Sequence, residues 1–259
     1  MKHRPVAVLV YSGLVLTGLL FSPNFAFAQG HGSSPHWSYS GANGPDHWGD
    51  LDPSFVACKS GKLQSPIDIE DSRKAQVMPL QFDYKPSPLK IINNGHTFQI
   101  NYAPGSIVTI GETPYQIVQF HFHTPSEEAI SGEHYDMVMH IVHKSANNKL
   151  VVVAVLLKRG KDNVFIQKLW ANLPSEEGTE TTVPNVTIDL TDALPTNHSY
   201  YHFTGSLTTP PCTEGVEFYI LKTPVEVSSA QIAMFARTFP MNARPIQLLN
   251  GREIQSVDF

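Results

Sequence analysis

The sequence predicts a mainly β domain with a large sheet and a few short peripheral helices. Short runs typical of strands dominate the chain, whereas only two segments show the apolar spacing of a helix. From residue 37 to Phe259 there is no stretch with the composition of a linker and no internal repeat. We therefore expect these residues to form a single domain.

Five segments carry the strand signals. Residues 89–102 contain two apolar runs around Asn-Asn-Gly, which is a turn signal. Residues 114–123 alternate between apolar and polar side chains, and residues 135–144 do so less cleanly. Residues 149–158 are apolar on both faces, which is typical of a central buried strand. The last strand is expected over residues 215–222.

Two segments are expected to be helices. Apolar side chains recur at helical spacing in residues 162–174, where Pro174 ends the pattern. Residues 228–239 show the same spacing after a capping box formed by Ser228 and Gln231. The side chains that would face the core are Ile166, Leu169, Trp170 and Leu173 in the first helix and Ile232, Phe235, Ala236 and Phe239 in the second.

Residues 1–28 have the pattern of a secretory signal peptide. A basic start precedes an apolar stretch, and Ala26-Phe27-Ala28 offers a cleavage site. The alternative is a membrane anchor, for which the apolar run is short. Residues 29–36 would form a flexible N-terminal segment. We therefore expect an exported protein, periplasmic or secreted, with no membrane span in its mature form.

The charge of the chain argues against nucleic-acid binding. The formal net charge is −5, and loss of the leader would remove two basic residues, Lys2 and Arg4, and no acidic ones. Binding to nucleic acid depends on clustered Lys and Arg that neutralise phosphates, and no such cluster stands out in the sequence. We expect no nucleic-acid partner.

The two cysteines, Cys58 and Cys212, are expected to form one disulfide. An even and minimal count in an exported chain favours a bridge, with two buried free thiols as the alternative. The bridge would close a loop of roughly 150 residues, worth about 4–5 kcal/mol if its effect is mainly on the entropy of the unfolded chain. It would tie the Thr-Thr-Pro-Pro turn that precedes Cys212 to the N-terminal part of the domain.

The segment QFHFH (119–123) raises the first functional question. Side chains alternate between faces along a strand, so Gln119, His121 and His123 share one face. Val118 and the two phenylalanines share the other face, which we interpret as core. A His-x-His pair by itself is weak evidence for a metal site, because solvent-facing or hydrogen-bonded histidines explain it more often.

A third histidine in the next strand segment strengthens the metal interpretation. His140 follows at the distance that a return strand needs, and it completes a set of three imidazoles with His121 and His123. Three histidines and one open position are typical of catalytic zinc, whereas structural zinc has a fourth protein ligand. His143 points to the opposite face of its strand, and His134 stays open as a fourth ligand.

Ordered motifs extend over most of the chain, from residue 36 to residue 252. They are HWSYSGANGPDHW (36–48), QSPIDI (64–69), NNGHTF (93–98), QFHFHTPSE (119–127), MHIVH (139–143), GSLTTPPCTEGV (205–216) and NARPIQLLNGR (242–252). In these motifs the sequence resembles the α-class carbonic anhydrases, of the exported bacterial type. The resemblance implies a twisted, mostly antiparallel sheet of about ten strands with zinc at the bottom of a conical cavity.

The resemblance implies an enzyme, a carbonic anhydrase with Zn²⁺ as its cofactor. Its reaction would be the reversible hydration of CO2 to bicarbonate and a proton, by attack of zinc-bound hydroxide. His121, His123 and His140 would be the zinc ligands. A threonine, here Thr208, would accept the hydroxide proton and donate its own to a buried glutamate, here Glu127.

The resemblance also assigns the substrate pocket and the route of the released proton. His96, in NNGHTF, would be the proton shuttle, which suits an imidazole because its pKa lies near neutral pH. Phe218 stands where the family commonly has tryptophan. The implied pocket residues are Val142, Val152, Leu207, Thr209 and Phe218, and the residues that would order the connecting waters are Tyr39, Asn94, Gln99 and Thr209.

The chain departs from the family pattern beside His140. A zinc-bound histidine donates its other N–H to an acceptor, and Gln119 would serve the histidine two residues after it. For His140 the family uses a glutamate two residues earlier, where this chain has Val138. We expect Glu128 to replace that carboxylate, with a water molecule as the alternative. Phe203 likewise replaces a tyrosine of the same network.

Three other functions stay open at this point. They are a catalytically silent binding protein on the same fold, a zinc-dependent esterase, and a zinc-binding or structural zinc protein. The complete set of three histidines argues against the first, and the absence of a G-x-S-x-G signature from the sequence argues against the second. The resemblance further implies inhibition by sulfonamides or anions. Oligomeric state stays open, with a homodimer as one possibility.

Overall fold

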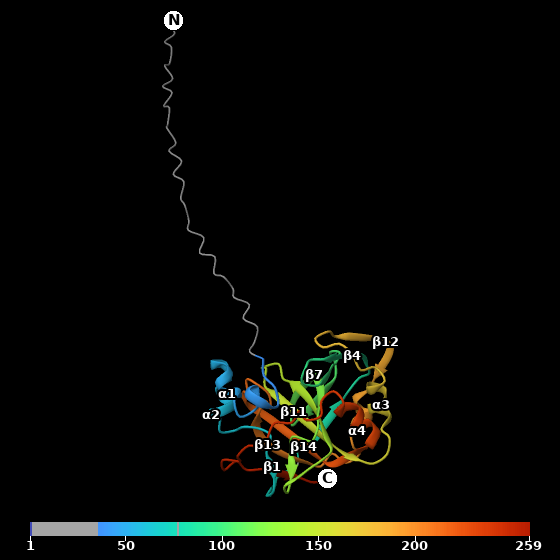
Figure 1. Ribbon diagram of the computed structural model, residues 1–259. Coiled ribbons are helices and arrows are strands. Elements are labelled where there is room, and N and C mark those ends of the chain that lie inside the picture. Colours follow the sequence, from blue (N-terminus) through green and yellow to red (C-terminus); the bar gives the residue numbers. More distant parts are fainter. Residues whose placement is uncertain (2–35, 77) are drawn as a thin grey trace. The chain divides into compact units, whose positions relative to one another are not determined.

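A twelve-stranded sheet forms the centre of the protein (Figure 1). The computed structural model describes Met1, residues 36–76 and residues 78–259. The expected signal peptide and nearly all of the N-terminal segment 29–36 lie outside these residues. The expected fold class is confirmed, although the sheet has twelve strands where about ten were expected.

The strands of this sheet follow one another in space in an order that differs from the chain order. Along the sheet they are β12 (Thr181–Ile188), β4 (Ser87–Asn93), β5 (Phe98–Asn101), β7 (Thr113–His123), β10 (Met137–Lys144), β11 (Leu150–Arg159), β14 (Glu214–Val227), β13 (Tyr200–Ser206), β15 (Gln255–Val257) and β2 (Arg73–Lys74). β6 (Ile107–Ile110) joins β7 to β3 (Leu80–Asp83), and a second, small sheet contains β1 (Asp68–Ile69), β8 (Ala129–Ile130) and β9 (Glu133–His134).

The large sheet is mostly antiparallel, as expected. Only the pairs β11–β14 and β15–β2 are parallel among its described strands. The five strand segments expected from the sequence are all present, as β4 and β5, β7, β10, β11 and β14. Residues 151–157 of β11 are buried without interruption, because this strand lies between β10 and β14 with side chains packed on both faces.

Both expected helices are present. α3 (Val164–Trp170) and α4 (Ser229–Ala236) pack together, and Trp170 Nε1 donates to the carbonyl of Gln231 at 2.9 Å. The capping box of Ser228 and Gln231 is formed as predicted. The remaining helices are short: α1 (Trp48–Leu51), α2 (Ala57–Ser60) and the 3-10 turns η1 (Gly41–Asn43), η2 (Pro53–Phe55) and η3 (Leu190–Ala193). Of the described helices, none is long and apolar enough to cross a membrane.

The two faces of the sheet carry different cores. Alternate residues of β10 divide between them: Met137, Met139 and Ile141 belong to the larger cluster, to which α3 and α4 contribute. Val138 belongs to the smaller cluster on the opposite face, and Val142 packs against that cluster. Strand alternation places His140 on the face of this smaller cluster. The site that contains His140 therefore lies on the face of the sheet that has the smaller apolar cluster.

The prediction for Val118 was wrong. This side chain is 43% exposed, whereas the two phenylalanines assigned to the same face are buried. Two consecutive residues of β10 pair with Gln119 and Ile117, so Val118 is an extra residue without a partner on β10. Such a bulge shifts the alternation of faces by one residue. Ile117 therefore occupies the core position that strict alternation gave to Val118.

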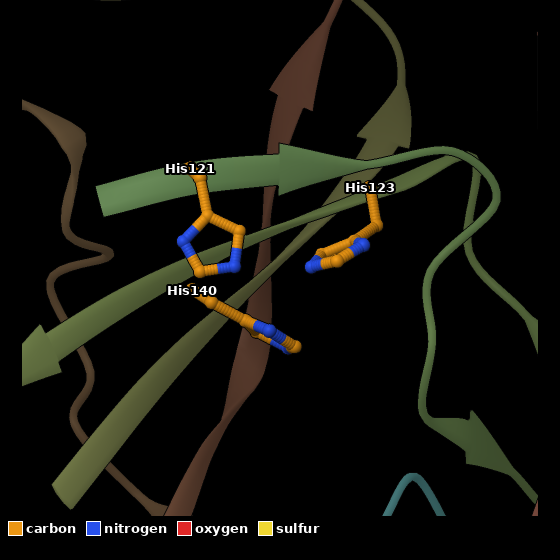
Figure 2. A group of neighbouring side chains, drawn as sticks. All are labelled: His121, His123 and His140. Atoms are coloured by element: carbon orange, nitrogen blue, oxygen red, sulfur yellow. The ribbon is translucent and has the colours of Figure 1, made fainter. Parts of the chain in front are cut away.

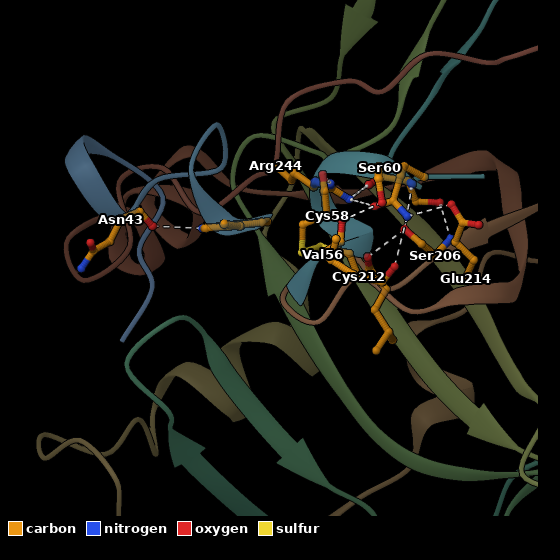
Figure 3. The surroundings of a disulfide bond; sticks show 12 residues. Asn43, Val56, Cys58, Ser60, Ser206, Cys212, Glu214 and Arg244 are labelled. Atoms are coloured by element: carbon orange, nitrogen blue, oxygen red, sulfur yellow. Dashed lines mark hydrogen bonds between the residues drawn. A yellow bond between two sulfur atoms is a disulfide. The ribbon is translucent and has the colours of Figure 1, made fainter. Parts of the chain in front are cut away.

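A disulfide and a buried arginine join three distant parts of the chain (Figure 3). Cys58 of α2 is bonded to Cys212, as expected, at a sequence separation of 154. The guanidinium of Arg244 donates to the carbonyls of Ser65 and Cys58 and to Gln64 Oε1 at 2.8–3.0 Å. Gln64 Nε2 in turn donates to the carbonyl of Cys212. The residue after the Thr-Thr-Pro-Pro turn, Cys212, is therefore held both by the disulfide and by the hydrogen bond from Gln64.

Removal of the disulfide should lower the free energy of unfolding by up to about 5 kcal/mol, because the unfolded chain regains the freedom of a very long loop. Denaturant unfolding of the oxidised protein and of Cys58→Ser/Cys212→Ser measures this difference. The single variant Cys58→Ser is the matched control and should lose the same amount. Two titratable thiols in the non-reduced, denatured protein would contradict the prediction.

Candidate metal centre

Three histidine rings from two adjacent strands point toward one another (Figure 2). His121 and His123 extend from the same face of β7, and His140 extends from β10, where it is paired directly with His121. Each ring offers one nitrogen, and the three nitrogens lie within 4.8 Å of one another. The predicted set of three histidines is therefore assembled by strand alternation and by the register of one strand pair.

Hydrogen bonds fix the tautomers of the two histidines on β7. His121 Nδ1 donates to Gln119 Oε1 at 2.8 Å, the contact expected from the sequence. His123 Nδ1 donates to the backbone carbonyl of Asn242 at 2.7 Å. Both acceptors hold the proton on Nδ1, so the lone pair is on Nε2. Burial lowers the pKa of His121 to about 3 and the pKa of His123 well below its usual range, and the neighbouring His140 adds to both shifts.

His140 is held from its other nitrogen by a carboxylate. His140 Nε2 lies 3.0 Å from Glu128 Oε1 and 3.2 Å from Glu128 Oε2, and both side chains are buried. This contact is the one expected in place of the missing glutamate at Val138. Burial by itself would lower the pKa of His140, but the Glu128 carboxylate outweighs it and the pKa is raised. A proton held on Nε2 leaves Nδ1 as the free nitrogen.

A second buried carboxylate lies beside the three rings. Glu127 Oε2 is 3.4 Å from His123 Nε2 and 3.7 Å from His140 Nδ1. Glu127 Oε1 accepts a hydrogen bond from the backbone N–H of Arg244 at 2.9 Å. Burial raises the pKa of Glu127 to about 7, whereas His140, the Arg244 amide and the Thr208 hydroxyl act in the opposite direction. Thr208 is thus among the groups that favour the ionised form of this carboxylate.

The residues fit a divalent metal ion. His123 Nε2 and Glu127 Oε2 are buried and have no hydrogen-bond partner among the described residues. Three neutral imidazoles with free lone pairs are a donor set that suits Zn²⁺. Two fully buried carboxylates, Glu127 and Glu128, place negative charge around them that a cation would offset. The candidate fourth ligand His134 is exposed and donates to the carbonyl of Ser126, so it does not belong to this group.

The chain matches one known protein family over most of its length. The family model of the eukaryotic-type carbonic anhydrases matches residues 43–258. The chain belongs to this family of α-class carbonic anhydrases. The family resemblance seen in the sequence motifs is confirmed, and with it the identity of the chain as an enzyme.

Relatives and solved structures agree with this family membership. A carbonic anhydrase from Klebsiella pneumoniae is 45% identical over 223 residues, which are 85% of this chain and 90% of the relative. One from Nostoc sp. is 39% identical over 245 residues, which are 93% and 92% of the two chains. The solved structure of the α-carbonic anhydrase from Thermovibrio ammonificans with sulfanilamide has a TM-score of 0.83 and 41% identity, and the match covers 86% of this chain and 100% of that one.

In this carbonic anhydrase the apolar residues assigned to the substrate pocket lie together. Val152 and Phe218 are buried in the smaller apolar cluster, and Val142 and Leu207 pack against it. The ring of Phe218 is 6.1 Å from that of His140 and nearly perpendicular to it. An apolar wall therefore adjoins His140.

The histidine assigned as proton shuttle lies in a cluster of aromatic rings. His96 stacks on Trp37 with a centroid distance of 3.6 Å, and His36 is 6.3 Å away. The carboxylate of Glu177 packs against the neighbouring Gly95, where an added Cβ would come within 2.5 Å of Glu177 Oε1. Burial lowers the pKa of His96, His36 adds to this effect, and Glu177 opposes it.

Two of the residues assigned to water ordering are joined to each other near His96. Asn94 Nδ2 donates to Gln99 Oε1 at 3.4 Å, and Gln99 is paired with His121 across strands β5 and β7. The Tyr39 ring is 6.4 Å from the His96 ring. Burial and the Glu127 carboxylate raise the pKa of Tyr39. Thr209 follows Thr208 directly and is partly buried.

Sequence reasoning missed several residues of this site. The motif NARP was recognised, but no signal showed that the carbonyl of Asn242 would hold His123 or that the amide of Arg244 would hold Glu127. Every residue has the same backbone carbonyl, and all but proline have the same N–H, so residue type does not show which of these groups will bind a site residue. Trp37 and Glu177 were also missed as neighbours of His96, because each is distant from it in sequence.

The His96 imidazole should titrate below its usual pKa of about 6.5. Glu177→Gln should lower this pKa further, because it removes the negative charge that favours the protonated ring. His36→Gln should raise it. NMR titration of the His96 ring resonances measures all three values, and the exposed neighbour Glu176→Gln is the control that should leave the pKa unchanged. A higher or unchanged pKa in Glu177→Gln would contradict the prediction.

Proposed function

We propose that this chain catalyses the zinc-dependent, reversible hydration of CO2 to bicarbonate and a proton. The observation that carries the proposal is the convergence of His121, His123 and His140, with their free nitrogens toward one point and a buried carboxylate beside them. The three histidines would hold the ion. When bound, zinc supplies a nucleophile at neutral pH because it lowers the pKa of water, as is established for carbonic anhydrases generally.

Thr208 and Glu127 orient the nucleophile. Glu127 already accepts the amide N–H of Arg244 on Oε1, and Oε2 has no hydrogen-bond partner within residues 36–76 and 78–259. An ionised carboxylate can only accept, so the Thr208 hydroxyl donates its proton to Glu127. The Thr208 oxygen is then left with acceptor lone pairs, which fix the direction of a donor placed over the histidines. A cation at the histidines favours the ionised form of Glu127 that this arrangement needs.

Apolar side chains bind the substrate. CO2 carries no charge and no hydrogen-bond donor, so a site made of Val142, Val152, Leu207 and Phe218 accepts it without loss of strong hydration. Bicarbonate is charged and is disfavoured in the same place. The wall therefore favours entry of substrate and release of product.

His96 carries the released proton to solvent. Its ring is half-buried beside Trp37, and its pKa lies below the usual value, so it can take up a proton and release it near neutral pH. Tyr39, Asn94, Gln99 and Thr209 order the waters that connect it to the histidine site.

The enzyme works outside the cytoplasm, in the periplasm or as a secreted protein. The signal-peptide pattern of residues 1–28 and the disulfide support this location. The catalytic domain then comprises residues 37–259, after the N-terminal segment 29–36.

The purified protein should contain one zinc ion per chain and hydrate CO2, and a chelator should abolish the activity until zinc is restored. A primary sulfonamide should inhibit it, as the sulfanilamide complex of the Thermovibrio ammonificans relative suggests. Metal analysis and a stopped-flow CO2 assay measure these quantities. Zinc without CO2 hydration would point to a zinc-binding or structural zinc protein, ester hydrolysis alone to an esterase, and neither property to a silent binding protein.

His96→Ala should slow CO2 hydration at least about 10-fold in dilute buffer, because proton removal then depends on water. Added imidazole should restore part of the rate. His36→Ala is the matched control: it removes the neighbouring imidazole and should leave most of the rate in place. An unchanged rate of His96→Ala in dilute buffer would contradict the role of His96.

A further inference from the structure

The carboxylate of Glu128 is buried and has a single hydrogen-bond partner. Its residue has 0% exposure, and both oxygens lie within 3.2 Å of His140 Nε2. In the described part of the chain no other group donates to this carboxylate. A buried carboxylate is costly unless a donor or a cation accompanies it. The position of Glu128 is therefore explained by His140 and by what His140 binds.

Glu128 makes His140 different from the other two histidines. The acceptor for His121 is the side-chain amide of Gln119, and the acceptor for His123 is a backbone carbonyl. Both of these are neutral. Only the acceptor for His140 is a carboxylate, and a hydrogen bond to a charged acceptor is roughly twice as strong as a neutral one. It pulls the Nε2 proton toward oxygen and makes the Nδ1 lone pair a stronger donor.

The backbone around Glu128 is fixed on both sides. The Ser126 hydroxyl donates to the carbonyl of Glu128 at 2.7 Å and itself accepts the N–H of Tyr135 at 2.9 Å. The next residue, Ala129, begins β8 and is paired with Asp68 of β1. These contacts hold the Glu128 carboxylate next to His140.

The strand that carries His140 has no polar side chain in the matching position. On β7, Gln119 stands two residues before His121 and reaches its ring. The equivalent residue on β10 is Val138, which is fully buried in the smaller apolar cluster. Phe203 of β13 stacks on Phe218 in the same cluster at 5.1 Å. The carboxylate that accepts the hydrogen bond from His140 therefore belongs to Glu128, in the loop before β8, and not to the strand that carries His140.

We propose that Glu128 is the positioning residue of the metal centre, which holds His140 through its Nε2 proton and sets how tightly zinc is retained. This inference rests on the proposed zinc enzyme. Glu128 does not touch substrate, and in the described part of the chain its carboxylate makes hydrogen bonds only with His140. The same geometry indicates that a carboxylate at position 138, two residues before His140 on the same face, could do the same work.

Glu128→Gln tests the charge with little change of shape. Loss of such an outer partner typically weakens metal binding or activity ~10–100-fold, and we expect an increase of this size in the zinc dissociation constant. Competition with a chromophoric chelator measures it independently of activity. Glu217→Gln is the matched control, because Glu217 also accepts from a histidine, His202 Nε2 at 2.9 Å, but away from the three histidines. Its zinc retention should equal that of the wild type.

A relocated charge should rescue the defect. Glu128→Gln/Val138→Glu is expected to recover at least about tenfold in zinc affinity over Glu128→Gln. A role in folding alone would not predict this recovery, since the second change buries a further polar group. Denaturant unfolding of the zinc-free proteins shows whether each variant is folded. In the wild type, NMR of the zinc-loaded protein should show a slowly exchanging His140 Nε2 proton, a test that needs no variant.

The outcomes separate this inference from the proposed function. A wild-type protein that holds no zinc, or holds it without CO2 hydration, would overturn the proposed function. A zinc-loaded active wild type together with unchanged zinc affinity in Glu128→Gln would overturn only the role of Glu128. Absence of the His140 Nε2 proton signal would overturn it as well, even if Glu128→Gln fails to fold.

Discussion

The antiparallel register between β7 and β10 is the constraint on which the site depends. It sets His140 directly opposite His121, while the alternation of β7 places His123 on the same face. A slip of one residue would turn every side chain of β10 to the other face. His140 would then enter the larger apolar core, and Met139 or Ile141 would replace it at the site. The buried methionines and isoleucine of β10 therefore help to specify the position of the histidine.

The acceptors behind the three imidazoles come from three parts of the fold. Gln119 belongs to the same strand as His121, the Asn242 carbonyl belongs to the C-terminal segment, and Glu128 belongs to the loop before β8. Each acceptor fixes one ring nitrogen as donor, so all three free nitrogens are available on the inner side. The orientation of the three free nitrogens is therefore a property of the tertiary fold.

Asn242 and Arg244, in the segment that follows α4, connect the three histidines with His96 and with the disulfide region. Asn242 binds His123 and also donates to the carbonyl of His96, and Arg244 binds Glu127 through its amide. The Arg244 side chain reaches the backbone of Cys58, next to the disulfide. His96, the three histidines and the disulfide region are thereby connected through two residues.

The sequence by itself determined the fold class, the principal strands, both longer helices, the disulfide and the set of three histidines. These follow from local periodicity, from a cysteine pair and from ordered motifs, all of which are visible in residue type. Tertiary structure alone decided the bulge at Val118, the carbonyl of Asn242 behind His123 and the placement of Glu177 beside His96. Shifts in strand pairing and the choice of backbone acceptors depend on which distant strands and loops come into contact. Those contacts cannot be predicted from residue type alone.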